Sequence, residues 1–189
     1  MRHLILAAIL LTSTAGFAQD TEQPPAEVKA EAPQPKAAVS ETLVFTLDGT
    51  VASHQKEMDA AIEDTIEDMN FITRPIARGK LQKSNVIFKK VTLGLEPDTV
   101  SIQLDARKAT KTKADGTQSV KWTRDDGDEF KVSQKREDNH ITQIYKGEDG
   151  SKVIDYNLSS DHKKLTMIVQ VKSSKLPKPL TYTLRYKAN

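Results

Sequence analysis

The 189-residue chain contains no cysteine. This absence excludes disulfide bonds, thiolate metal sites, a cysteine nucleophile and the lipid-modified cysteine of a bacterial lipoprotein. A folded domain in this chain must therefore be held together by its hydrophobic core alone. About 150 residues suffice for that, because a domain of this size buries roughly 70% of its unfolded surface.

The chain also lacks a strong excess of either sign of charge. Its formal net charge is +2, although 29% of its residues are charged. A mixed surface of this kind is typical of a soluble domain and not of a nucleic-acid-binding protein. Beyond Leu11 no stretch is long and apolar enough to span a bilayer, so we expect no membrane span once the N-terminal segment is removed.

Motifs for enzymatic chemistry are missing as well. The sequence has no glycine-rich phosphate loop, no Gly-x-Ser-x-Gly elbow and no His-Glu-x-x-His helix. The histidines His54, His140 and His162 lie far apart without metal-ligand spacing, and we expect His162, beside Asp161, to be a solvated turn residue. The carboxylates fall in predicted turns or on one helix face, where they make poor general acids. The sequence predicts a non-enzymatic protein without a metal or other cofactor.

Residues 1–18 have the pattern of a signal peptide. Arg2 and His3 make a short basic start, and Leu4 to Leu11 form an apolar core of a length suited to export. Gly16-Phe17-Ala18 offers small residues at the two positions that a signal peptidase reads. An uncleaved membrane anchor and a buried N-terminal helix are the alternatives. We expect an exported protein, periplasmic or secreted, and the periplasm of a Gram-negative bacterium fits best with the missing cysteines.

Residues 19–41 are dominated by Pro, Ala and Glu and contain no aromatic residue. Such a segment cannot bury enough apolar surface to offset the entropy that ordering costs. We therefore predict a disordered linker over residues 19–41 and a single folded domain over residues 42–189.

One apolar face of helical spacing follows a short predicted strand at the start of this domain. Its members recur at steps of three and four residues: Met58, Ile62, Ile66, Met69, Ile72 and Ile76. Ser53 is a candidate N-cap, Pro75 should kink or end the helix, and Gly79 is a plausible stop. The pattern predicts one long N-terminal helix. Its opposite face is acidic: Glu57, Asp59, Glu63, Asp64, Glu67 and Asp68.

The remaining chain consists of short alternating segments separated by turn dipeptides such as Asp115-Gly116 and Asp149-Gly150. Sequential hairpins without an intervening helix build an antiparallel meander. The predicted strands are 43–47, 86–95, 99–104, 109–113, 119–124, 129–136, 140–146, 153–158, 165–172 and 180–187. We expect a mainly β fold, a barrel or half-barrel of about eight strands, with the helix as its cover.

Alternation along these strands defines one apolar face and one polar face. A slip of one residue would turn every apolar side chain toward water, so the register is well specified. The predicted inner face contains Trp122, Phe130, Val132, Ile154, Tyr156, Leu158, Leu165, Met167, Val169, Val171, Leu180, Tyr182, Leu184 and Tyr186.

The helix followed by a meander, the Lys-Trp-Thr strand, and the stretches Tyr-x-Leu-Ser-x-Asp-x-Lys-x-Leu-Thr-Met and Leu-Pro-x-Pro-Leu-Thr-Tyr resemble the lipocalin-like (calycin-type) secreted bacterial domains. The resemblance covers about residues 43–187. It implies a barrel that holds a small apolar ligand. Fatty-acid-binding relatives place Arg and Tyr two residues apart on the last strand to hold a carboxylate. Here Arg185 and Tyr186 are adjacent, so they point to opposite faces, and Arg124 becomes the candidate polar group.

Trp122 and Arg124 lie two residues apart and therefore share the inner face. An inward arginine near aromatic walls could meet the anionic head of a ligand whose tail the walls accept. The alternative is that Trp122 anchors the core and Arg124 extends from the strand end beside Asp125 and Asp126. The candidate ligand-binding residues are Trp122, Arg124, Tyr156, Met167, Tyr182 and Tyr186.

Two functions fit these features. The first is a non-enzymatic exported protein that binds a small apolar or amphipathic ligand inside the barrel. The alternative is a periplasmic protein-interaction or envelope-scaffold module with a fully packed core, which would use the acidic helix face or the basic outer strands as its working surface.

Overall fold

The computed structural model describes residues 40–124 and 127–189. The predicted signal peptide at 1–18 lies outside the described residues, as does the predicted linker except for Ser40 and Glu41, and Glu41 is already the first residue of β1. The elements in chain order are β1 (Glu41–Leu47), α1 (Val51–Ile66), α2 (Thr73–Ser84), β2 (Lys90–Leu95), β3 (Thr99–Leu104), β4 (Thr110–Lys113), β5 (Asp115–Thr123), β6 (Glu129–Glu137), β7 (His140–Lys146), β8 (Gly150–Leu158), β9 (Lys164–Ser173) and β10 (Leu180–Ala188).

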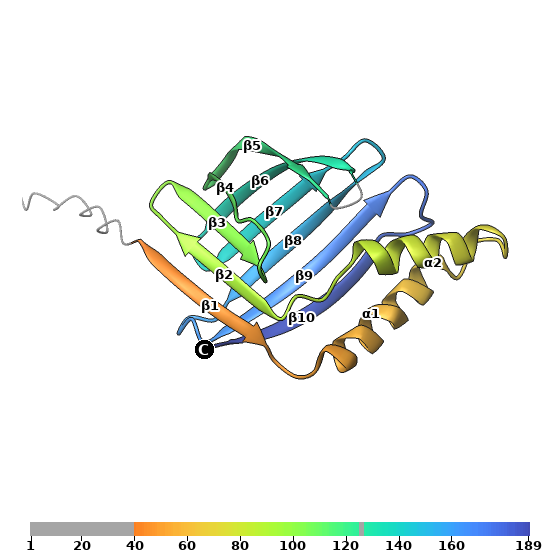
Figure 1. The fold of residues 1–189 in the computed structure, drawn as a ribbon, viewed down its shortest axis with the longest axis horizontal. Helices are drawn as coiled ribbons and strands as arrows, with labels where there is room; N and C mark the ends of the chain where they lie inside the picture. The colour runs from red at the N-terminus through yellow and green to blue at the C-terminus, as the bar shows by residue number, and fades with distance from the viewer. Residues whose placement is uncertain (1–39, 125–126) are drawn as a thin grey trace, which may run out of the picture. The chain divides into compact units, whose positions relative to one another are not determined.

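All ten strands belong to one antiparallel sheet with the order β4-β3-β2-β1-β10-β9-β8-β7-β6-β5. Strand β1 joins the two halves because it pairs with β2 on one side and β10 on the other. Figure 1 shows the sheet curling so that its two edges, β4 and β5, approach each other. The predicted mainly β barrel is confirmed, but the expected number of about eight strands is wrong. Every predicted segment pairs within the sheet, including the four-residue β4.

Side-chain bonds and one backbone bond join the β4 edge to β6, next to the other edge strand β5. The Thr112 hydroxyl donates to Gln134 Oε1 at 3.0 Å, and Gln134 Nε2 donates to the Thr110 carbonyl at 3.1 Å. The Arg136 amide donates to the carbonyl of Ala114 at 2.8 Å. Gln134 is fully buried, so these bonds are made away from water, where their loss is costly. The barrel is therefore nearly closed.

The inner face of the barrel is the one that alternation predicts. Tyr156, Met167 and Leu184 are at most 1% exposed, and they lie directly across neighbouring strands in the Tyr156–Met167 and Leu184–Met167 pairs. Even-numbered residues of β8 and β10 point inward together with odd-numbered residues of β9. The predicted register is confirmed here because only this one buries the apolar set.

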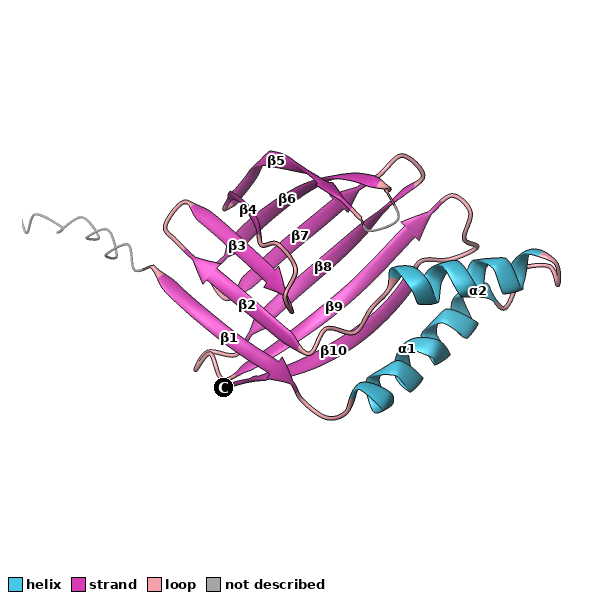
Figure 2. Ribbon diagram, in the orientation of Figure 1, coloured by secondary structure: helices cyan, strands magenta, loops and turns pink. Residues whose placement is uncertain are grey.

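The prediction of a single long helix is wrong, because the helical conformation is interrupted around Asn70 and two helices form. Asn70 Oδ1 accepts the amides of Ile72 and Thr73 at 3.0 and 2.9 Å, which starts α2 as a separate helix. Pro75 falls in the first turn of α2, where its missing amide has no consequence, so it does not end the helix. Figure 2 shows the two helices in the connection that leads from β1 to β2, beside the sheet.

The expected helix boundaries differ from the observed ones. Thr50, and not Ser53, caps α1 by accepting the Ser53 amide at 3.1 Å. Gly79 lies within α2 and does not stop it. The predicted apolar face also divides: Met58, Ile62 and Ile66 are buried, whereas residues beyond the break such as Ile72 and Ile76 are 64% and 59% exposed.

Helix α1 lies against β10 and α2 (Figure 1). Its acidic face forms ion pairs with neighbouring elements: Glu63 with Arg78 of α2, and Asp64 and Glu67 with Lys178 at 3.1 and 2.8 Å. The acidic face is thus partly neutralised within the domain. Neither helix of the described residues is long and apolar enough to cross a membrane.

Candidate functional site

A cavity of about 480 Å³ opens at the end of the barrel where β3, β5 and β7 finish and where β8 begins. The segment that links α2 to β2, around Asn85 and Phe88, forms one side of it. The described hairpin residues that follow β3 and β7 form the others. Volumes of several hundred cubic ångströms are typical of sites for small organic ligands. The core below is closely packed, so the cavity occupies the mouth of the barrel.

Three aromatic rings form one wall of the cavity. Trp122 lies edge-on to Tyr145, with ring centroids 5.3 Å apart and planes at 78°. Phe130 completes the cluster at 5.8 Å from Trp122 and 6.4 Å from Tyr145. Trp122 and Phe130 face each other across the β5–β6 pair, and Tyr145 comes from β7. The cluster offers a rigid apolar surface to a ligand.

Lys152 places an amine on the same cavity. It lies on β8 in the inward-facing series of Ile154 and Tyr156, directly opposite Tyr145 on β7. Its Nζ donates to Asn85 Oδ1 at 3.0 Å, and no carboxylate of the described residues lies within ion-pair distance. Burial, with a smaller contribution from nearby arginines, lowers the pKa of Lys152 to about 8. Part of its surface stays accessible because the cavity adjoins it.

Asn85 organises the polar part of the site. It is 1% exposed, and its Oδ1 accepts from both Lys152 and the Tyr182 hydroxyl, the latter at 3.3 Å. Its Nδ2 donates to the carbonyl of Leu81 at 2.9 Å, while its own backbone amide donates to the same oxygen at 3.0 Å. Asn85 therefore connects the end of α2 to two strands of the barrel and fixes the position of the Lys152 amine.

Two arginines stand near the cavity mouth. The Arg107 guanidinium lies 4.9 Å from the centroid of the Phe88 ring, and that of Arg124 lies 5.6 Å from the Phe130 ring. Arg124 also pairs with Asp128 at 2.5 Å. Both cations lower the pKa of Lys152 because like charges disfavour its protonated form. The cavity lining carries six basic side chains and four carboxylates, Asp128, Glu129, Glu148 and Asp149, so its balance of charge is positive.

The six predicted ligand residues divide into two groups. Trp122 and Arg124 line the cavity. The other four face inward but are packed into the core, and none of them lines the cavity: Tyr156, Met167, Tyr182 and Tyr186.

Each buried tyrosine hydroxyl of this second group has a partner within the barrel. Tyr156 donates to Gln143 Oε1 at 2.9 Å, and Tyr186 donates to the carbonyl of Phe88 at 3.0 Å. Desolvation raises the pKa of Tyr156 and Tyr186 above that of an ordinary phenol, so both remain neutral donors. Arg185 is exposed on the outer face while Tyr186 is buried, as the adjacent pair predicts.

Sequence reasoning missed Lys152 and Asn85. A signal for Lys152 existed, because it precedes Ile154 by two residues and continues the same alternation. The predicted strand began at Val153 and therefore excluded it. Asn85 had no periodic signal, since it lies in the segment between α2 and β2.

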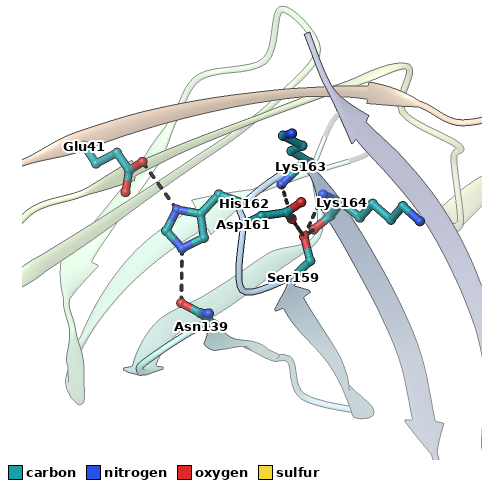
Figure 3. Close-up of polar contacts among 7 residues, drawn as sticks. All are labelled: Glu41, Asn139, Ser159, Asp161, His162, Lys163 and Lys164. Atoms are coloured by element: carbon teal, nitrogen blue, oxygen red, sulfur yellow. Dashed lines mark hydrogen bonds and ion pairs between the residues drawn. The ribbon is translucent and has the colours of Figure 1, made fainter.

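The opposite end of the barrel holds a second polar cluster, drawn in Figure 3. His162 Nδ1 lies 3.4 Å from Glu41 Oε1, and its Nε2 lies 3.2 Å from Asn139 Oδ1. The ring thus links the β8–β9 turn to β1 and to the β6–β7 turn. His162 lies in a turn, as expected, with a φ of 54°, but it is half-buried and bonded on both ring nitrogens and is therefore not the fully solvated residue that was expected. Among the described residues, no group of three or more His, Asp and Glu side chains could hold a metal ion.

Comparison with solved structures returns fatty-acid-binding proteins. A brain-tissue protein of Drosophila melanogaster shares 16% identity, covering 78% of this chain and 97% of that one, with a TM-score of 0.41. Fatty-acid-binding protein 1 of Echinococcus granulosus shares 13% over 77% and 94%, with a TM-score of 0.45. The Schistosoma mansoni protein in complex with arachidonic acid shares 15% over 77% and 93%, with a TM-score of 0.40.

All three TM-scores are below 0.5. The fold is therefore defined by its own strand order and register. No protein-family profile matches the chain. No curated protein matches it either.

Proposed function

We propose that the barrel binds a small amphipathic ligand with an anionic head group, without catalysing a reaction on it. The observation that carries this proposal is the Lys152 amine, which faces a 480 Å³ cavity without a carboxylate partner among the described residues. A buried cation is costly unless it is paired. An anionic head group would supply that missing partner.

The aromatic cluster gives the ligand its apolar contact. Trp122, Phe130 and Tyr145 line the cavity together with Ile102 and Val171. Apolar surface buried against them contributes roughly 25 cal/mol per Å². A head group near Lys152 and a chain against the rings would use both parts of the site, which is the composition expected of a pocket for an amphipathic molecule.

The test is a titration with three ligands of equal chain length: dodecanoate, dodecanol and dodecylamine. Trp122 is the only tryptophan in the chain, so its emission reports on the aromatic wall. We expect dodecanoate to bind at least about tenfold more tightly than dodecanol, and dodecylamine to bind weakest, because a charge-assisted bond contributes about 1.5–3 kcal/mol.

The variant Lys152→Met should remove the preference for dodecanoate while leaving dodecanol binding in place. Its matched control is Lys146→Met, which deletes the same charge from the exposed face of the neighbouring strand β7. Equal affinities for the three ligands in the unaltered protein would refute an anion-selective site. The cavity itself disfavours the alternative of a fully packed core.

We further propose that the chain is exported, on the basis of the basic start and short apolar run within residues 1–18. Cleavage after Ala18 would give a mature chain that begins at Gln19. The intact mass of the protein isolated from its native source tests this proposal, and a chain that retains residues 1–18 would contradict it.

A further inference from the structure

We infer that Lys152 also forms an imine with apolar-chain aldehydes that enter the cavity. This inference deepens the proposed function and rests on it, because the aldehyde would occupy the same cavity as the anionic ligand. It assigns to this site a second class of ligand, which is neutral and held covalently.

The geometry leaves the amine available for reaction. Lys152 has one hydrogen bond among the described residues, donated to Asn85 Oδ1. A neutral amine that donates one N–H to Asn85 keeps its lone pair free for a carbonyl carbon in the cavity. Because Asn85 is buried and bonded to Leu81 and Tyr182, it holds the amine in one position. A fixed nucleophile beside a binding cavity reacts as if the aldehyde were highly concentrated.

Burial also increases the share of the reactive form. With a pKa of about 8, roughly a fifth of Lys152 side chains are neutral at pH 7.4. An ordinary lysine has a neutral fraction of about 0.1% at this pH, so the amine of Lys152 is available on the order of 200-fold more often. Desolvated lysines are activated as nucleophiles in this way.

The reaction balances without an oxidant or reductant. The Nζ lone pair attacks the aldehyde carbon, a C–N bond forms, and a proton moves from nitrogen to the former carbonyl oxygen. The resulting carbinolamine loses its hydroxyl group together with the remaining proton on nitrogen as water, and the nitrogen lone pair forms the C=N bond. The products are the Lys152 imine and one water molecule. Apolar walls beside the amine, from Tyr145 and Val171, disfavour the water that would reverse the step.

The experiment treats the full folded chain with a limiting amount of dodecanal at pH 7.4 and traps imines with cyanoborohydride. Mass spectrometry of peptides then gives the extent of labelling at each lysine. We expect Lys152 to be labelled at least about tenfold faster than the exposed Lys146 and Lys164, and dodecanoate to protect it. Labelling of Lys152 at the rate of exposed lysines would overturn the inference.

The variant Lys152→Arg separates the two proposals, because a guanidinium keeps the positive charge but does not form the imine. It should retain its preference for dodecanoate and lose the fast labelling. Dodecanoate binding in the unaltered protein without fast labelling would refute the imine and leave the proposed function standing. Absence of both binding and labelling would refute both.

Discussion

Replacing Lys152 by methionine should stabilise the protein at neutral pH. Methionine has a flexible apolar side chain of similar reach, and Tyr182 still donates to Asn85 in the variant. The pKa of Lys152 falls from 10.5 to about 8 on folding, and each unit corresponds to 1.36 kcal/mol. The buried charge therefore costs about 3 kcal/mol. Lys152 borders the cavity and keeps part of its surface accessible, which reduces this cost, so we expect a gain of about 1–3 kcal/mol.

The effect should depend on pH in a defined direction. Below pH 8 the lysine is protonated in both folded and unfolded states, and the cost of burying the charge is present in full. Between pH 8 and 10.5 the folded state loses this proton first, so the unfolded state binds more protons and the stability of the unaltered protein rises with pH. The advantage of the methionine variant should therefore shrink across this window.

Urea unfolding at pH 7 and pH 9.5 measures this advantage, with Lys146→Met as the control for loss of an exposed charge. Buried tyrosines act in the opposite direction above pH 10: burial raises the pKa of Tyr145 to about 12, so its contribution to stability is lost as the pH rises. This contribution is common to both proteins and cancels in their difference. A methionine variant that is less stable at pH 7, or an advantage that does not change with pH, would refute the placement of Lys152.

Three further substitutions test the packing and closure of the domain. Gly150→Ala would put a Cβ 2.1 Å from the carbonyl oxygen of Lys172, so it should force β8 and β9 apart and lower the free energy of unfolding by about 1–3 kcal/mol in a denaturant titration. Gly79→Ala, which meets no atom within 4 Å on α2, should be neutral or stabilising. Gln134→Leu removes the bonds that join β6 to Thr112 and Thr110 of β4 and should speed hydrogen exchange in β4. Unchanged exchange would show that these bonds do not close the barrel.

The strands were predictable because their side chains alternate and the turns between them are short. Alternation places Met167 and Leu184 on the same inner face, and the structure pairs them directly across β9 and β10. The break between α1 and α2 was not predictable from periodicity. The apolar spacing runs through it to Ile76, and the local bonds of Asn70 decide where α2 starts. Two hydrogen bonds accepted by one side chain thus outweigh the apolar repeat.

The candidate site was only partly predictable. Trp122 and Arg124 followed from their shared face and their aromatic neighbours. The extent of packing could not be read from alternation, since Tyr156 and Trp122 have the same pattern although only Trp122 borders the cavity. Lys152 lies where a strand pattern begins, and a lysine there usually faces water. Its burial depends on Asn85, which is 67 residues away in the sequence.

The central claim is that the Lys152 amine receives the head group of an anionic ligand inside the cavity. A crystal structure of the protein with dodecanoate tests this claim most directly. We predict electron density for the carboxylate within hydrogen-bond distance of Lys152 Nζ, with the chain against Trp122 and Tyr145. A carboxylate bound elsewhere, on the exposed apolar surface of Phe71 and Ile72 for example, with the cavity empty, would contradict the claim.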